Sequence, residues 1–266
     1  MSKHIFLASC ALVALSVTAT AADLPRRTNA AAPSPALVGN WSGFYVGVSS
    51  GASLASNQLT TSSVYAAGGW FAQSSVDKLN SIGKVDVSSA HPLLSLSIGH
   101  NTQFNNTVVG VELDATMMRL RKNTSITDDF PPAFSPNKMT VNQKASSDWL
   151  VTLRPRVGML ISNYLVYGTA GVALAQEKGE FSFSSTYNNS ESGSFNRTKF
   201  GWVAGAGLER KFSQNLSLKA EYLFVNINEA KTTSSNFTSS ALNVFTHKLD
   251  INQNLIRVGV NYKFGG

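Results

Sequence analysis

Strict two-residue alternation of bulky and small or polar side chains is the feature that most restricts what this chain can fold into. In residues 43–54, which read GFYVGVSSGASL, and in residues 255–264, which read LIRVGVNYKF, bulky apolar residues occupy every second position. The positions between them hold glycine, serine or a charge. A period of two residues is that of a β-strand with two different faces. The pattern therefore predicts an all-β chain.

Eight segments carry this alternation, and their even number suits an antiparallel up-and-down order. They span residues 43–54, 93–101, 107–120, 149–161, 164–176, 199–212, 215–227 and 249–264. Pro155 falls on the apolar face of the fourth segment. Because proline has no N–H to donate to a strand ladder, we expect a local bulge there.

The connections between the segments alternate in length. Three of them, residues 101–106, 162–163 and 213–214, are short and rich in Asn and Ser, which suit turns. The other four are each about 20 to 36 residues long and span residues 55–90, 121–148, 177–198 and 228–248. Outer-membrane barrels pair short periplasmic turns with long external loops. We expect three such turns and four such loops.

The polar face of the segments favours a membrane barrel over a soluble sheet. In residues 107–120, Val111 and Leu113 alternate with Glu112 and Asp114. A soluble sandwich or ligand-binding barrel would turn its bulky face inward, and a solvated outer face would not need the many glycines that share the charged face. Small residues do suit a narrow lumen, where they leave room for long side chains. We expect a closed lumen in which these residues pair: Glu112, Asp114, Arg154, Arg156, Glu209, Lys219, Glu221, Arg257 and Lys263.

The aromatic residues are consistent with two membrane interfaces, where barrels carry aromatic girdles. One group, near the short turns, is Trp41, Phe44, Tyr164, Phe212, Tyr222, Tyr262 and Phe264. The other, toward the long connections, is Trp149, Phe200, Trp202 and Phe224.

The expected mature chain has no run of about 18 apolar residues, which argues against a helical membrane protein.

The N-terminus predicts export. Lys3, the apolar run 5–17 and the small residues 19–21 form a secretory signal over residues 1–21. Residues 7–10 also resemble a lipoprotein cleavage box, which would place lipid on Cys10. Since Cys10 is the single cysteine, removal of the signal would leave no disulfide or thiolate chemistry.

The domain organisation that follows has three parts. Residues 22–40, with several prolines and alanines, are expected to form a periplasmic linker, and residues 41–266 the outer-membrane barrel. The net charge is +7, but the basic residues are dispersed among acids without a run of five. We therefore expect no nucleic-acid partner.

Five segments and the start of the expected mature chain share the motifs of one known group of proteins. They are ADLP (22–25), NWSGFYVGVSSG (40–51), LVYGTAGVALA (165–175), GWVAGAGLER (201–210), LKAEYLFV (218–225) and NLIRVGVNYKF (254–264). Taken in order, they resemble the small outer-membrane β-barrel proteins of the porin or opacity-like family of rhizobial-type alphaproteobacteria.

The resemblance implies an eight-stranded barrel inserted by the outer-membrane assembly machinery. That machinery reads a last strand ending in an aromatic residue, and Phe264, with Tyr262, matches this signal. The chain departs from the family pattern by continuing to Gly265 and Gly266.

No known catalytic motif stands in the structural context that it needs, so we expect no enzyme and no bound cofactor. The one G-x-S-x-G match, GVSSG at residues 47–51, lies within an expected strand and forms no strand-to-helix elbow, and the sequence has no phosphate-binding loop. His91, His100 and His247 are too dispersed to share a metal. Some members of the family that this chain resembles bind haem. His91 or His247 is therefore a minor candidate for an axial ligand of a haem iron.

The function expected from these observations is that of a structural and surface-interaction protein. Its predicted partners are outer-membrane lipid and lipopolysaccharide, the assembly machinery, and host or environmental ligands that bind the loops. Lipid phosphates would bind the basic residues Arg119, Arg121, Lys122 and Lys144. The alternatives are a narrow porin for small solutes and a surface receptor for haem or another host ligand.

Overall fold

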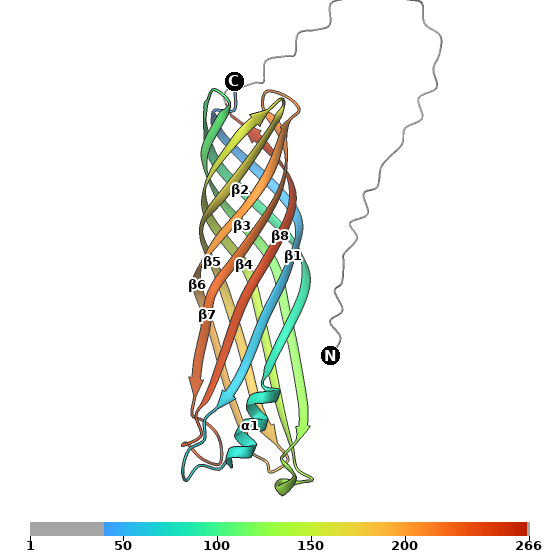
Figure 1. The fold of residues 1–266 in the computed structure, drawn as a ribbon, viewed down its shortest axis with the longest axis vertical. Coiled ribbons are helices and arrows are strands. Elements are labelled where there is room, and N and C mark those ends of the chain that lie inside the picture. Colours follow the sequence, from blue (N-terminus) through green and yellow to red (C-terminus); the bar gives the residue numbers. More distant parts are fainter. Residues whose placement is uncertain (1–39, 265–266) are drawn as a thin grey trace, which may run out of the picture. The chain divides into compact units, whose positions relative to one another are not determined.

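Eight antiparallel strands close into a barrel in which every strand pairs with its neighbours in sequence and β8 pairs with β1 (Figure 1). The computed structural model describes residues 40–264, so the expected signal, nearly all of the linker, Gly265 and Gly266 lie outside the described residues. The elements are β1 (Gly43–Ser63), α1 (Gln73–Ile82), β2 (Lys84–Phe104), β3 (Thr107–Asp129), the 3-10 helix η1 (Pro132–Phe134), β4 (Lys138–Ile161), β5 (Tyr164–Ser185), β6 (Ser190–Lys211), β7 (Leu216–Ser234) and β8 (Phe245–Lys263).

The strands are longer than the sequence predicts. The shortest, β7 and β8, have 19 residues, and the longest, β4, has 24, whereas about 9 to 11 residues are enough to cross a bilayer. Most residues of the four expected external loops therefore continue the strands. The connections that remain at that end are residues 64–83, 130–137, 186–189 and 235–244.

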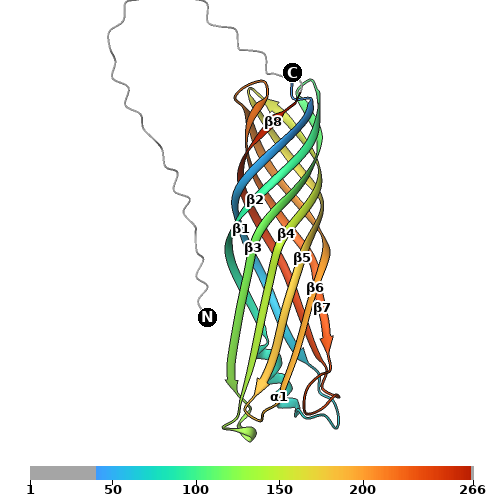
Figure 2. The ribbon, with the colours of Figure 1, turned by 180° about the vertical axis from the view of Figure 1, so that it is seen from behind.

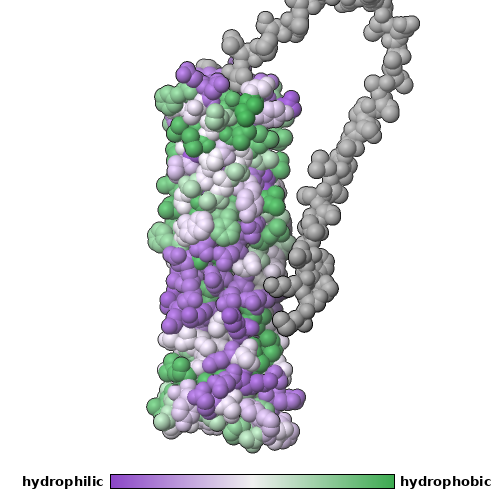
Figure 3. All heavy atoms as spheres, viewed as in Figure 1, coloured by the Kyte–Doolittle hydropathy of each residue, from purple (hydrophilic) through white to green (hydrophobic). Residues whose placement is uncertain are grey.

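The outward face near the short turns is apolar, as predicted. Val111 is 45% exposed, Leu153 48% and Val258 52%. We call this band of outward apolar side chains the belt. On the face drawn in Figure 3, the half of the barrel near the short turns carries green, hydrophobic residues among paler ones, and a strongly hydrophilic zone begins directly beyond it. We call the part of the strands beyond the belt the extension.

The wall of the barrel divides at the border between the belt and the extension. β2 pairs with β3 only from Phe104↔Thr107 to Leu93↔Met118, and β6 pairs with β7 only from Lys211↔Ser217 to Gly201↔Ile227. The other six strand pairs continue into the extension. Beyond the belt, the strands thus form two four-stranded sheets, β3-β4-β5-β6 and β7-β8-β1-β2.

The interior of the extension is an aromatic core. Phe183 and Phe245 pack with Phe71 and with the α1 residues Val76 and Leu79. Both ribbon views place α1 at the end of the barrel opposite the short turns (Figure 2). Within residues 40–264 no helix is long and apolar enough to cross a membrane.

Hydrogen bonds hold α1 against the end of β1. The Asn80 side chain accepts from the Ser63 N–H at 2.9 Å and donates to the Ser63 carbonyl at 3.1 Å. The Gly83 carbonyl, just after the helix, accepts from the Thr61 N–H at 2.8 Å. The spacing of Val76, Leu79 and Ile82 places these buried side chains on one helix face.

Two local expectations need correction. The register between β4 and β5 is the same on both sides of Pro155, and the irregularity lies instead between Ser146 and Leu150. Pro155 is exposed on the belt, and its carbonyl accepts a bond of 2.8 Å from the Thr169 hydroxyl. Trp41 is buried under the short-turn end, so it is not part of an outer aromatic girdle.

Candidate functional site

The lumen inside the belt contains a compact network of buried charges. Strand alternation turns every second side chain inward, and four carboxylates and four cations meet there. None of these eight residues is more than 4% exposed. We call them the lumen network: Glu112 and Asp114 on β3, Arg154 and Arg156 on β4, Glu209 on β6, Lys219 and Glu221 on β7, and Arg257 on β8.

Glu112 is the centre of the lumen network. Its Oε1 lies 2.6 Å from Arg154 Nη2, and its Oε2 lies 3.1 Å from Lys219 Nζ. Arg156 and Arg257 are also within ion-pair distance, at 3.7 and 3.8 Å. Four cations thus surround one carboxylate, which compensates for the cost of removing it from water.

Glu221 forms a second centre on the opposite wall. It accepts from Arg154 Nη1 at 3.1 Å and from Arg257 Nε at 2.8 Å. Arg257 continues to Asp114 through a bond of 2.8 Å from its Nη1. Arg154 bridges the two centres because it bonds both Glu112 and Glu221.

Arg156 and Glu209 extend the lumen network toward the short turns. Arg156 Nη1 lies 3.2 Å from Glu209 Oε2, and its Nε donates to Asn101 Oδ1 at 2.9 Å. Glu209 also accepts from Asn261 Nδ2 at 2.8 Å and from the Ser217 hydroxyl.

Two tyrosines that the predicted set omits complete the lumen network. Tyr45 donates its hydroxyl to Glu112 at 2.7 Å, and Tyr167 donates to Glu221 at 2.9 Å. The Arg156 guanidinium lies 4.8 Å from the Tyr45 ring centre and 5.0 Å from that of Tyr167, within cation–π distance.

Glycines make room for these rings. A Cβ at Gly99 would lie 2.3 Å from the Tyr45 hydroxyl oxygen, and one at Gly207 would lie 2.4 Å from that of Tyr167. An inward tyrosine opposite a glycine on the next strand is the sequence signal that could have identified both.

Lys263 is the one predicted member that lies apart. It is near the short-turn end, where its Nζ donates to the backbone carbonyls of Asn40 at 2.9 Å and Ser42 at 3.3 Å.

The predicted assembly signal, Tyr262 and Phe264, also lies at the short-turn end. The rings of Tyr262 and Phe264 are both exposed and meet edge to face, with centroids 5.1 Å apart.

An apolar layer lies beyond the lumen network on the extension side. Leu150, Leu223, Val225 and Leu255 belong to one buried cluster that includes residues from β2 to β8. An ion in contact with these apolar side chains would lose its hydration without gaining a polar partner. On the β1 side of the lumen the buried residues are polar instead, and the Ser53 hydroxyl lies 3.2 Å from Gln253 Oε1. The lumen is thus filled by the charged network and, beyond it, mainly by apolar side chains.

Glu177 is a buried carboxyl in the extension, beyond this layer. Glu177 is fully buried, and neither carboxylate oxygen has a hydrogen-bond partner among the described residues. Burial raises the pKa of Glu177 to about 8, with Lys199 opposing the shift and Asp250 adding to it. The folded chain therefore holds a proton that the unfolded chain releases near its ordinary pKa.

We expect stability to fall as the pH rises from about 4.5 to 8, because the folded state binds more protons than the unfolded state over this range. The loss should reach up to about 5 kcal/mol and then level off. Glu177→Gln should abolish it, as measured by urea unfolding in lipid vesicles at a series of pH values. Glu180→Gln, an exposed change on the same strand, is the control, and a wild-type pH slope that persists in Glu177→Gln would contradict the assignment.

The three histidines lie far apart in the barrel. His247 is completely buried in the extension, stacked on Phe181 and 3.2 Å from both Thr61 Oγ1 and Glu191 Oε1. His100 lies on β2 near the short turns and packs against Phe44. No cluster of three or more His, Cys, Asp or Glu suited to a metal occurs in the described part of the chain.

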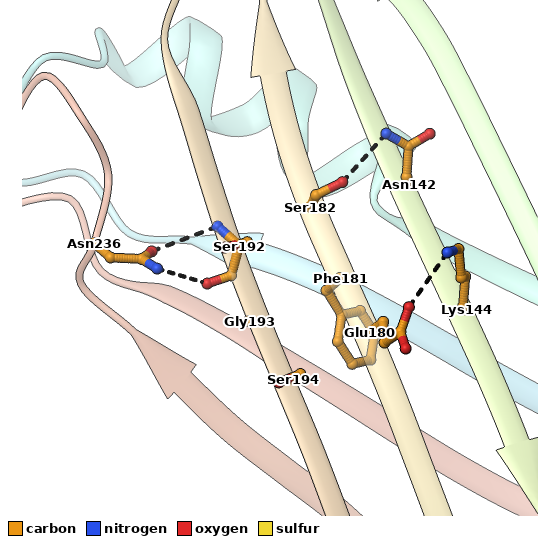
Figure 4. A pocket seen from close by; sticks show the side chains of 9 residues that line it. All are labelled: Asn142, Lys144, Glu180, Phe181, Ser182, Ser192, Gly193, Ser194 and Asn236. Carbon is orange, nitrogen blue, oxygen red and sulfur yellow. Dashed lines mark hydrogen bonds and ion pairs between the residues drawn. The ribbon is translucent and has the colours of Figure 1, made fainter.

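The outer face of the extension has a polar groove over β4, β5 and β6 (Figure 4). Its volume is about 490 Å3. Lys144 Nζ pairs with Glu180 Oε2 at 3.3 Å on one side, and on the other Asn236 bonds the backbone of Ser192, with 2.9 Å from its Nδ2 to the carbonyl. Asn236 thereby covers part of the β6 edge that β7 leaves unpaired.

Known proteins resemble this chain over most of its length. The family model described as "Outer membrane protein beta-barrel domain" matches residues 7–264. The chain is 29% identical over 272 residues to the 31 kDa outer-membrane immunogenic protein of Brucella melitensis, covering 98% of this chain and 100% of that protein. It is 27% identical over 166 residues to a 22 kDa outer membrane protein of Rhizobium leguminosarum, covering 62% and 63% of the two chains. A solved structure, OprG of Pseudomonas aeruginosa, aligns with 86% of this chain and 99% of its own at 13% identity and a TM-score of 0.49.

Proposed function

Because the chain belongs to the outer membrane protein β-barrel family, we propose that it is a structural and surface protein of the bacterial outer membrane whose lumen is closed to solutes. The observation that supports this proposal is the packing of the lumen, in which eight paired charges are followed by a mainly apolar layer. A conducting pore would need a continuous hydrated path past these side chains.

The partners in this proposal follow from the two halves of the barrel. The belt contacts lipid, and the polar outer faces of the two sheets in the extension meet lipopolysaccharide and host or environmental ligands. The assembly machinery reads Tyr262 and Phe264. The proposal includes no catalysis and no nucleic-acid partner.

A haem receptor is a weaker alternative, because His247 has no exposed surface and already contacts Thr61 and Glu191. Haem could reach it only after the aromatic core of the extension separates. This leaves His91, which is partly buried on β2, as the candidate ligand.

We expect the purified protein to give no steady conductance in planar bilayers. The physical reason is the cost of moving an ion through a dry lumen. Insertion is checked in the same sample by the mobility of unheated and heated protein in detergent gels, since folded barrels migrate anomalously until heated. A steady conductance well above the bare bilayer, from protein shown to be folded, would favour the porin alternative instead.

A further inference from the structure

The wall of the barrel opens on one side where β2 and β3 separate, and a pocket of about 470 Å3 lies there. The last pair is Leu93↔Met118. The next residue on β2 is Pro92, which has no N–H to continue the ladder. On β3, the register with β4 shifts between Met117 and Leu120. Both strands are thus interrupted at the same point.

The floor of this pocket is apolar and connects two surfaces. Leu94 and Met117 are exposed and belong to the belt, whereas Leu93 and Met118 are buried in the apolar layer of the lumen. Methionine is unbranched and polarizable, so it adapts its shape to an inserted apolar group. A lipid acyl chain lying on this floor would remain in contact with the hydrocarbon of the bilayer.

The rim of the pocket on the extension side is basic. Arg119 and Arg121 line it together with Asp148. Asp148 already accepts from two cations, Arg121 Nη2 and Lys178 Nζ, each at 2.9 Å. Arg119 is exposed and has no ion pair among the described residues. The rim therefore carries an excess of positive charge, and its guanidinium groups match the geometry of a phosphate.

We propose that this pocket, the fork pocket, binds one molecule of a phosphorylated and acylated lipid of the outer leaflet. One acyl chain lies on the floor of Leu94, Met117 and Met118, and the phosphate binds Arg119 and Arg121. A soluble anion would use only the rim and an uncharged hydrocarbon only the floor. The pocket lies at the border of the belt, where the head group and chains of a lipid meet.

This inference deepens the proposed function, because it requires the belt to lie in a membrane. It also narrows the set of basic residues expected from the sequence to bind lipid phosphate. Lys122 is partly buried on the other face of β3 from Arg121. Lys144 pairs with Glu180 in the polar groove and is not a lining residue of the fork pocket. These two lysines therefore provide a matched control.

The test uses the purified protein in detergent and lipid A as the probe, with the number of bound molecules and the affinity read by native mass spectrometry. We expect one lipid A per chain, and at least tenfold weaker binding by Arg119→Gln/Arg121→Gln. Lys122→Gln/Lys144→Gln removes the same net charge and should bind within twofold of wild type. None of the four side chains belongs to a buried hydrophobic cluster, and the heat-dependent gel shift checks that each variant is folded.

Two further arms separate the contributions of phosphate and acyl chain. Dephosphorylated lipid A should bind at least tenfold more weakly, and millimolar inorganic phosphate should not displace the lipid. Equal losses of lipid A affinity in the arginine and lysine variants, or displacement of lipid A by inorganic phosphate, would contradict the assignment of the fork pocket as a lipid site. Bilayer conductance tests the closed lumen separately, so the failure of one proposal is distinguishable from the failure of the other.

Discussion

Replacing Glu112 with glutamine should cost about 3 to 5 kcal/mol of unfolding free energy, the range for breaking a buried ion pair by removing one partner. Glu112 is buried in the lumen and lies within 4 Å of four cations. The amide keeps the shape of the side chain but leaves Arg154 and Lys219 with an unbalanced charge. Reversible urea unfolding from lipid vesicles, followed by tryptophan fluorescence, measures the loss.

Glu180→Gln is the matched control, since Glu180 forms an exposed pair with Lys144. Such surface pairs contribute at most about 1 kcal/mol. The double variant Glu112→Gln/Lys219→Met restores charge balance, so it should lose less than the sum of the two single variants. Equal small losses for Glu112→Gln and Glu180→Gln would show that the lumen is hydrated rather than sealed.

An arginine on the middle of the belt should also be costly. Leu153 faces outward on β4 between Leu113 of β3 and Val172 of β5. A charged side chain facing lipid near the bilayer midplane destabilises a barrel by about 2 to 4 kcal/mol. We therefore expect Leu153→Arg to lose that amount of unfolding free energy in the same assay.

The control for this change is Asn142→Arg, on the same strand but in the extension. Asn142 lines the polar groove (Figure 4), where an arginine remains in water, so the change should cost less than about 1 kcal/mol. If both arginines cost the same, the outward face of β4 would have one environment along its length, and the belt would be wrong as defined.

The belt and the lumen network could be predicted because lipid imposes a simple rule. Lipid-facing and lumen-facing positions alternate without exception, so residues such as Val111 and Glu112 are assigned by parity alone. The odd or even position of a residue tells which face of the strand it is on, but not how far along the barrel axis it lies. Lys263 has the parity of the lumen network but lies too near the short turns to reach it.

The extension was missed because the pattern inverts at the end of the belt. On β8, Val258 and Ile256 face outward, but Leu249 and Ile251 face inward. Once water replaces lipid outside, the apolar residues must occupy the interior. Phe181 and Phe183 show the same inversion on β5, because their apolar side chains face inward whereas Val172 in the belt faces outward. Both phenylalanines fall in a segment that the sequence pattern assigns to a loop.

The interior helix was missed for a related reason. α1 has only 10 residues, and its buried positions Val76, Leu79 and Ile82 stand among polar neighbours. A helix this short is not stable alone and depends on packing. Its stability comes from the aromatic core that the two sheets enclose, which becomes apparent only when Phe183 and Phe245 are brought together.

Accessibility of spin labels on β8 tests the inside-out arrangement most directly. In a Cys10→Ala background, labels are placed at Val258→Cys in the belt and at Thr246→Cys in the extension, and the protein is inserted into lipid vesicles. The Val258 label should relax more with oxygen, which concentrates in hydrocarbon, than with a water-soluble nickel chelate, and the Thr246 label should show the reverse. A Val258 label that neither reagent reaches, or that nickel reaches as readily as at Thr246, would contradict an apolar wall turned toward lipid around a charged interior.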